Sequence, residues 1–157
     1  IPGYFLERSF KMYENYTNQS LPTQEYRLLL GTCLCVFASN NGFIIENILE
    51  SPEQKKDWYE LTDMTSGLLI PDLKKRLKTE NKKLSDEILD VFCDLVDKRN
   101  RIIHSFQITN YMDEQVLATK TKINEGNKQF EITEEYMLDF IRLNNRLSDL
   151  LHHLRGF

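Results

Sequence analysis

Long apolar runs, cysteine and histidine are scarce in this chain, and each scarcity excludes a class of protein. The longest apolar run, 28–38, is interrupted by Gly31 and Thr32 and falls short of the roughly 20 residues that a membrane-spanning helix needs. The three cysteines are an odd number, which does not suit a disulfide framework. The three histidines form no cluster at metal-ligand spacing, and no glycine-rich phosphate loop or Gly-x-Ser-x-Gly motif is present.

These absences lead to expectations about cofactors, surroundings and thiols. We expect no metal, no cofactor and no association with a membrane. We also expect a cytoplasmic protein, in which Cys33, Cys35 and Cys93 are buried free thiols.

Composition and charge favour one folded domain. Hydrophobic residues make up 41% of the 157 positions and charged residues 28%, which suits a sizeable core. The net charge of −4 argues against a protein that coats nucleic acid broadly. Segment 72–83 is locally basic; we favour a solvated helix face there, with an electrostatic guide for a polyanion as the alternative. We predict a single domain over 1–157, with 1–22 as an N-terminal arm or short helix.

Apolar periodicity and capping residues predict an all-α bundle. Thr23 and Thr133 are expected helix caps, and Ser51 with Gln54 has the spacing of a capping box. The polar stretch 39–42 predicts a kink or turn inside the first long helix. The predicted helical segments are 23–38, 43–50, 51–66, 71–78, 85–106 and 133–155.

One small β-hairpin is predicted between the last two long helices, over about 115–132. Segments 116–122 and 129–132 are rich in residues that favour strands, and 124–127 between them contains a glycine. The predicted architecture is therefore a helical bundle with one inserted hairpin.

The predicted helix 85–106 carries an arginine on its apolar face. Residues at steps of three and four form this face: Ile88, Phe92, Leu95, Arg99, Ile102 and Phe106. A guanidinium in such a stripe is costly unless a negative group meets it. Two alternatives are equally open: a carboxylate of another helix, such as Glu46 or Asp139, or an anion from outside the protein.

Arg99 and His104 together suit RNA cleavage without a metal. The arginine fork matches phosphate oxygens, and histidine transfers protons near neutral pH. The 2′-hydroxyl of the RNA would be the nucleophile, Arg99 would stabilise the phosphate charge, and His104 would be the general acid or base. The two residues are about 140° apart around an ideal helix. We therefore expect a cleft shared by two copies across a two-fold axis.

The motif formed by Arg99, Asn100 and His104 resembles that of the HEPN superfamily. In that family an arginine, often followed by asparagine, precedes a histidine by four to six residues in an all-α bundle. The resemblance implies a HEPN-like bundle and a metal-independent endoribonuclease, with Arg99 and His104 catalytic and Asn100 supporting. It also implies an RNA substrate, a homodimer, a role as a toxin or in antiviral defence, and an antitoxin or regulatory partner.

Two features qualify the motif. Some toxin members carry a tyrosine two residues after the histidine, where this chain has Phe106, so modification of a hydroxyl there is not expected. A second arginine–histidine pair, Arg146 and His152, lacks the asparagine, and we interpret it as the ordinary basic end of a helix.

Two other functions stay open. One is a non-catalytic HEPN-like module that binds nucleotides or a partner, which the acidic net charge fits better. The other is a structural domain in which Arg99 forms an internal ion pair. In that case Arg99→Ala should cost about 3–5 kcal/mol.

Overall fold

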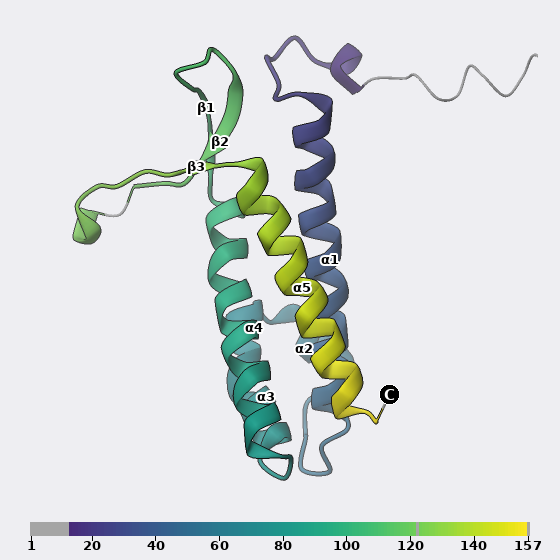
Figure 1. Cartoon of the computed structure of the whole chain (residues 1–157). Coiled ribbons are helices and arrows are strands. Elements are labelled where there is room, and N and C mark those ends of the chain that lie inside the picture. The colour runs from purple at the N-terminus through teal and green to yellow at the C-terminus, as the bar shows by residue number, and fades with distance from the viewer. Residues whose placement is uncertain (1–12, 122, 157) are drawn as a thin grey trace, which may run out of the picture.

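The computed structural model describes residues 13–121 and 123–156, which form helices and a small antiparallel sheet (Figure 1). The α-helices are α1 (Gln24–Leu49), α2 (Trp58–Asp63), α3 (Ile70–Leu77), α4 (Lys82–Ile103) and α5 (Glu134–Leu154). The strands are β1 (Phe106–Thr109), β2 (Gln115–Ala118) and β3 (Glu131–Ile132), and short 3-10 helices are η1 (Tyr13–Tyr16), η2 (Ser66–Leu69) and η3 (Ile123–Glu125). The predicted mostly helical fold is confirmed. Of the predicted N-terminal arm, 1–12 lie outside the described residues.

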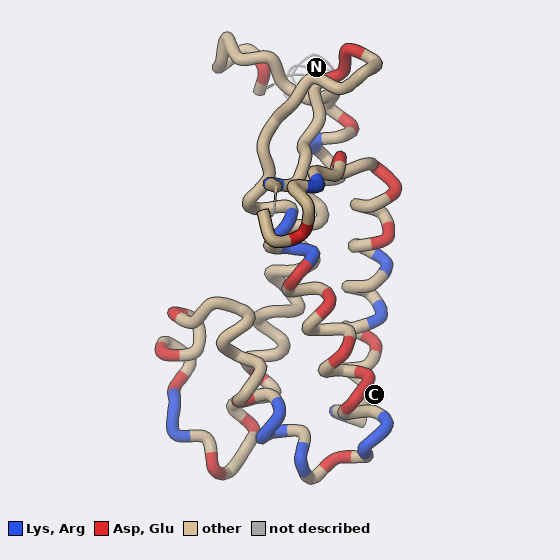
Figure 2. Tube along the Cα trace, turned by 90° about the vertical axis from the view of Figure 1, so that its left-hand side faces the viewer, with Lys and Arg blue, Asp and Glu red and all other residues tan. Residues whose placement is uncertain are grey.

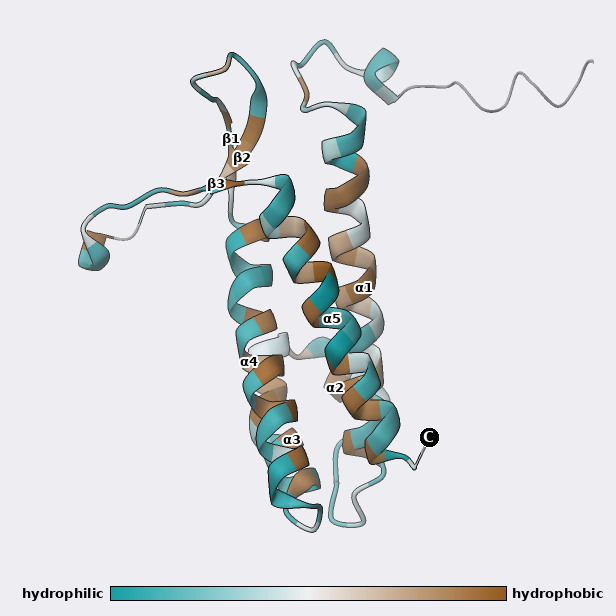
Figure 3. Cartoon of the chain, in the orientation of Figure 1, coloured by the Kyte–Doolittle hydropathy of each residue, from teal (hydrophilic) through white to brown (hydrophobic). Residues whose placement is uncertain are grey.

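Three long helices, α1, α4 and α5, lie side by side and enclose the core (Figure 1). Ile44 of α1, Phe92 of α4 and Phe140 of α5 are each completely buried. Along α4 and α5 the hydrophobic positions recur at the spacing of one face (Figure 3). Helix α1 is apolar around more of its circumference, and Leu28 and Leu34 on it are exposed. The short helix α3 packs on α1 and α4, so the core extends to a second layer.

Helix α1 runs unbroken through 39–42, so the predicted interruption is wrong. Asn40 is buried there, and its amide donates hydrogen bonds to the carbonyl of Asn144 at 2.8 Å and to its Oδ1 at 2.9 Å. In an isolated helix the Asn40 side chain would compete for the backbone hydrogen bonds, but here it bonds to α5 instead. The predicted cap at the start of α1 is confirmed, since the hydroxyl of Thr23 accepts from the amide of Tyr26.

Helix α1 is also long and apolar enough to cross a membrane, by length and composition. No charged residue lies between Arg27 and Glu46. Because Gly31 and Thr32 interrupt the apolar run, the length of that run alone does not reveal this property. Core helices share it, and in this structure Cys33, Phe37 and Ile48 of α1 are buried against other parts of the fold.

The helix predicted from Ser51 begins later, at Trp58. Asp57 and Glu60 form a reciprocal capping box, with the Glu60 amide donating to Asp57 at 2.9 Å and the Asp57 amide donating to Glu60 at 2.8 Å. Residue Ser51 instead accepts a turn hydrogen bond from the amide of Gln54. The observed cap, Asp57, has both hydrogen bonds of the capping box. Ser51 and Gln54, which have the same spacing, belong to a turn after α1 instead.

Helix α4 ends at Ile103, earlier than predicted, and Phe106 begins β1 instead of continuing the apolar face. Strands β1 and β2 pair antiparallel with Phe106 opposite Ala118, and β2 pairs with β3. The predicted hairpin is confirmed as β2 and β3, while β1 was not foreseen. The hydroxyl of Tyr26 donates to the carbonyl of Ile132 at 2.5 Å and accepts from the amide of Leu117 at 3.0 Å, which attaches the sheet to α1.

The connection between β2 and β3 projects from the bundle (Figure 1). We call its described residues, 119–121 and 123–130, the arm. The predicted turn within it contains Gly126 and Asn127, both with positive φ, at 77° and 55°. Glycine adopts this conformation without a steric penalty.

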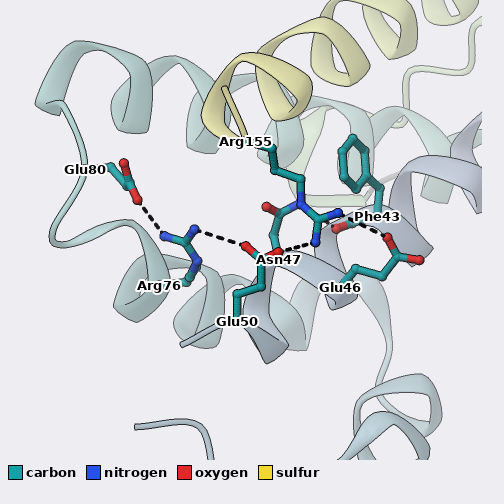
Figure 4. A network of polar contacts seen from close by, with 7 residues as sticks. All are labelled: Phe43, Glu46, Asn47, Glu50, Arg76, Glu80 and Arg155. Atoms are coloured by element: carbon teal, nitrogen blue, oxygen red, sulfur yellow. Dashed lines mark hydrogen bonds and ion pairs between the residues drawn. The ribbon is translucent and has the colours of Figure 1, made fainter. Parts of the chain in front are cut away.

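A network of charged residues holds the end of α1 against α3 and the end of α5 (Figure 4). Glu50 at the end of α1 accepts from Arg76 of α3 at 3.4 Å and from Arg155, the residue after α5. Arg76 also pairs with Glu80 at 2.8 Å, and Arg155 with Glu46 at 4.0 Å. Each arginine here therefore has two carboxylates.

The three cysteines differ in exposure. Cys33 is fully buried, and burial raises the pKa of its thiol to about 11. Cys35 and Cys93 are exposed, so the expectation of burial is wrong for both. Cys35 lies two residues beyond Cys33, about 200° around the same helix, and so faces solvent.

Candidate functional site

A cleft of about 560 Å³ lies between the C-terminal turns of α4 and the arm. Its lining from α4 and the residue after it consists of Asp97, Arg99, Asn100, Arg101 and His104. Its lining from the arm consists of Thr119, Lys120, Glu125, Lys128 and Phe130, and Thr65 before η2 completes it. One chain thus forms a cleft of the size that ligand sites commonly have.

The three motif residues, Arg99, Asn100 and His104, all line this cleft within a single chain. The sequence-based interpretation placed Arg99 and His104 on two adjacent faces of one helix and expected two copies to bring both faces to one groove. That expectation assumed an ideal helix through His104, but His104 follows the last helical residue and has φ −96° and ψ 24°. The arm lines the cleft from the other side, so residues of α4 and of the arm meet there.

Arg99 is half-buried at the wall of the cleft. Its Nη2 donates to the hydroxyl of Ser66 at 3.1 Å, and its guanidinium carbon lies 5.2 Å from the centre of the Phe37 ring. Burial lowers the pKa of the Arg99 guanidinium from its ordinary value, although an arginine stays charged at neutral pH. The aromatic face stabilises the cation without neutralising it.

Arg99 forms no ion pair with any residue that the structure describes. The two acids considered as partners lie elsewhere: Glu46 pairs with Arg155 at 4.0 Å, and Asp139 pairs with Arg142 at 2.9 Å. The alternative of an internal ion pair with either acid is therefore not what the structure shows. Within 13–121 and 123–156, the positive charge of Arg99 has no carboxylate partner.

His104 and Asn100 present exposed side chains to the same cleft. The amide of His104 donates to the carbonyl of Asn100 at 3.0 Å, which fixes the backbone at the helix end. His104 is exposed, and its imidazole has no hydrogen bond to another described residue. Such a histidine can accept or donate a proton at a bound substrate.

The cleft is a positive region on an acidic protein. Four cations line it, namely Arg99, Arg101, Lys120 and Lys128, against the two acids Asp97 and Glu125. Arg101 and Asp97 pair with each other at 3.1 Å. Figure 2, which faces the side from which the arm projects, shows lysine and arginine positions gathered where the arm lies in front of the bundle. A cleft with this charge attracts anions, although the whole chain carries −4.

The lining residues of the arm were missed by sequence reasoning. Lys120, Lys128 and Phe130 flank a predicted turn, but nothing in the spacing of the chain links that turn to the motif helix.

No group of three or more histidine, cysteine, aspartate or glutamate side chains among the described residues could hold a metal ion.

The second arginine–histidine pair does not form a comparable site. Arg146 is mostly exposed and pairs with Glu87 at 3.6 Å. The ring of His152 packs edge-on against Phe43 and makes a 2.7 Å contact between its Nδ1 and the carbonyl of Ser148. His152 lines a separate hollow that Arg146 does not reach. The interpretation as ordinary residues of a helix end fits these contacts.

Comparison with known proteins finds no match to this chain among protein-family models, curated proteins or solved structures. The HEPN resemblance therefore depends on Arg99, Asn100 and His104 alone.

Proposed function

We propose that the chain is a metal-independent endoribonuclease of the HEPN type, with Arg99 and His104 catalytic and Asn100 supporting. One observation carries the proposal: the three motif residues line one cleft, and its arginine has no carboxylate partner among the described residues. The phosphodiester of RNA is an anion whose oxygens match the donor fork of arginine.

The proposed reaction is attack of an RNA 2′-hydroxyl on the adjacent phosphorus. The O2′–P bond forms, the P–O5′ bond breaks, the 2′-hydroxyl loses its proton and the 5′-oxygen gains one. His104 is the general base for the first proton or the general acid for the second, and Arg99 stabilises the charge on the five-coordinate phosphate. Asn100 supports the substrate through its amide. The products are a 2′,3′-cyclic phosphate and a 5′-hydroxyl.

The resemblance also supplies the proposed setting, which is a toxin or an antiviral-defence effector in the cytoplasm, controlled by an antitoxin or another regulatory partner. Phe106 follows His104 by two residues and has no hydroxyl, so control by modification at that position is not part of the proposal.

We further propose a homodimer, whose mass can be measured by light scattering. Because one chain already brings Arg99 and His104 to one cleft, dimerisation is not needed to assemble the motif. A dimer would instead place two such clefts in one particle.

The deciding experiment is cleavage of a mixed RNA in EDTA by the purified protein. Arg99→Ala is expected to lower the rate about 10²–10³-fold and His104→Ala about 10²–10⁴-fold, while Arg146→Ala stays close to wild type. Circular dichroism checks that each variant is folded. A folded wild-type protein that cleaves no RNA, or undiminished cleavage by both motif variants, would refute the proposal.

A binding module without catalysis is the second candidate. It is favoured by the exposed ring of His104, which no described residue orients by a hydrogen bond. Catalytic histidines commonly have such an orienting partner. Saturable binding of a nucleotide by the wild type, with no turnover of any RNA, would support this function over the nuclease.

A further inference from the structure

Phe130 is an exposed aromatic side chain at the base of the arm. Its side chain is 58% exposed and lines the cleft that contains the motif residues. An isolated exposed phenylalanine needs no explanation, but one that lies in a positively charged cleft offers a flat apolar surface to a ligand.

The backbone of Phe130 is fixed by two hydrogen bonds to Thr119. The amide of Thr119 donates to the carbonyl of Phe130 at 2.8 Å, and the amide of Phe130 donates to the hydroxyl of Thr119 at 3.0 Å. Ala118 pairs with Glu131, so the bonds between the next two residues, Thr119 and Phe130, extend the β2–β3 pairing by one step into the arm. Thr119 itself is buried. The ring of Phe130 is thus carried by a defined part of the backbone.

Two lysines of the arm line the same cleft. Lys120 and Lys128 are exposed and form no ion pair with a described residue. The arm therefore brings two cations and one aromatic ring to the cleft wall that faces Arg99. Proteins that bind single-stranded nucleic acid combine cations along the backbone with aromatic rings on which bases stack.

We propose that Phe130 is a stacking platform for one unpaired base, and that Lys120 and Lys128 hold the neighbouring phosphates, so that the cleft selects single-stranded RNA. This inference depends on the proposed function, because it places the base beside the phosphate held by Arg99. Bases in a duplex already stack on one another and cannot lie on Phe130 without being unpaired.

The test measures binding rather than cleavage, by fluorescence anisotropy at low salt. The probe is a single-stranded RNA of mixed sequence with every 2′-hydroxyl methylated, so that it cannot be cleaved. Phe130→Ala is expected to weaken binding about 5- to 150-fold, the usual effect of losing one base–aromatic stack. Phe130→Trp should retain binding.

Phe106 provides a matched control. This residue is 59% exposed and begins strand β1, on the other side of β2 from Phe130, but it does not line the cleft. Phe106→Ala should leave the affinity unchanged. Equal effects of Phe106→Ala and Phe130→Ala would overturn the inference, since they would indicate a general change of the sheet.

Two altered probes sharpen the result. In a series of RNAs that each lack one base, removal of the stacked base should weaken binding to the wild type but not to Phe130→Ala. A duplex of the same sequence should bind more weakly and be insensitive to Phe130→Ala. If duplex and single strand lose affinity equally, the stacking role is refuted.

The inference and the proposed function fail in distinguishable ways. If the wild type cleaves RNA in an Arg99-dependent way, and Phe130→Ala binds and cleaves RNA as well as the wild type does, the inference alone is wrong. If the folded wild type neither binds nor cleaves single-stranded RNA, the proposed function is wrong as well.

Discussion

Two arginines lie over phenylalanine rings of α1 and differ in the charges around them. The guanidinium carbon of Arg99 is 5.2 Å from the ring centre of Phe37, and that of Arg155 is 5.2 Å from the ring centre of Phe43. Both Nε atoms are buried without a hydrogen-bond partner in the part of the chain that the structure describes. Arg155 has Glu46 and Glu50 beside it, whereas the one hydrogen-bond partner of Arg99 among the described residues is the hydroxyl of Ser66.

Arg155 therefore belongs to an internal ion-pair network, whereas Arg99 is a cation that can bind a ligand. At Arg155 the protein supplies its own counter-charge and connects two helix ends. At Arg99 the same kind of aromatic contact stabilises the cation, but no residue that the structure describes supplies a counter-charge, and a bound anion can supply it. This difference is what makes Arg99, among the half-buried arginines, the candidate for phosphate binding.

The largest expected effect is on catalysis. If the proposed function is right, Arg99→Ala should lower the cleavage rate about 10²–10³-fold, as removal of one charge-stabilising donor does. Arg99→Lys should recover only part of it, because an ammonium lacks the planar donor fork. Arg155→Ala should cleave within a few-fold of wild type at a temperature where it remains folded. Equal losses in the Arg99 and Arg155 variants would remove the distinction between the two sites.

The next effect is on stability, at the network of Figure 4. Glu50→Ala removes a carboxylate from both Arg76 and Arg155 and is expected to lower the free energy of unfolding by about 1–2 kcal/mol. That value lies between the effects of exposed and buried pairs, since the Glu50 side chain is 44% exposed. Urea denaturation measures it.

The control for this change is Glu135→Ala, which removes a carboxylate that is 71% exposed and pairs only with Arg142 on the surface. It should leave the free energy of unfolding essentially unchanged. A Glu50 variant as stable as the Glu135 variant would mean that the network does not stabilise the fold.

Local signals predicted those parts of the fold that local chemistry decides. Thr23 and Thr133 cap α1 and α5 as expected, and each accepts from the amide three residues later. One error was itself local, since Asp57 and not Ser51 has the complete capping box. Errors also occurred where distant contacts decide: Asn40 continues α1 because it bonds to α5. Sequence periodicity contains no information about such partners.

The candidate site shows the same division. Arg99, Asn100 and His104 were identified from one helix, and the structure brings them to one cleft. The other wall, with Phe130, is more than 25 positions away in sequence and reaches the cleft only through the pairing of β2 with β3. No local pattern connects the two walls.

A smaller effect is expected when Arg99 is replaced by an apolar residue of similar length. Because Arg99→Met leaves no carboxylate of the described residues unpaired, it should be neutral or stabilise the fold by about 0.5–1 kcal/mol, as is common where function maintains a costly group. Thermal unfolding measures it. The matched variant is Arg76→Met, which leaves Glu80 unpaired and removes one of the two arginines that contact Glu50, and which should therefore destabilise. A loss of about 3–5 kcal/mol for Arg99→Met would instead support the structural interpretation of Arg99.

The smallest effect is protection by inorganic phosphate. A ligand that binds only the folded state stabilises it by about 0.4 kcal/mol when its concentration equals its Kd, which raises Tm by about 1–2 °C in a chain of this size. Phosphate also stabilises many proteins without a site, so chloride at equal ionic strength and the Arg99→Met variant are both needed as controls. Wild type should gain more from phosphate than Arg99→Met, whereas Arg155→Ala should gain as much as wild type. Equal shifts in wild type and Arg99→Met would show that phosphate acts elsewhere, and the distinction between the two arginines would then be one of structure alone.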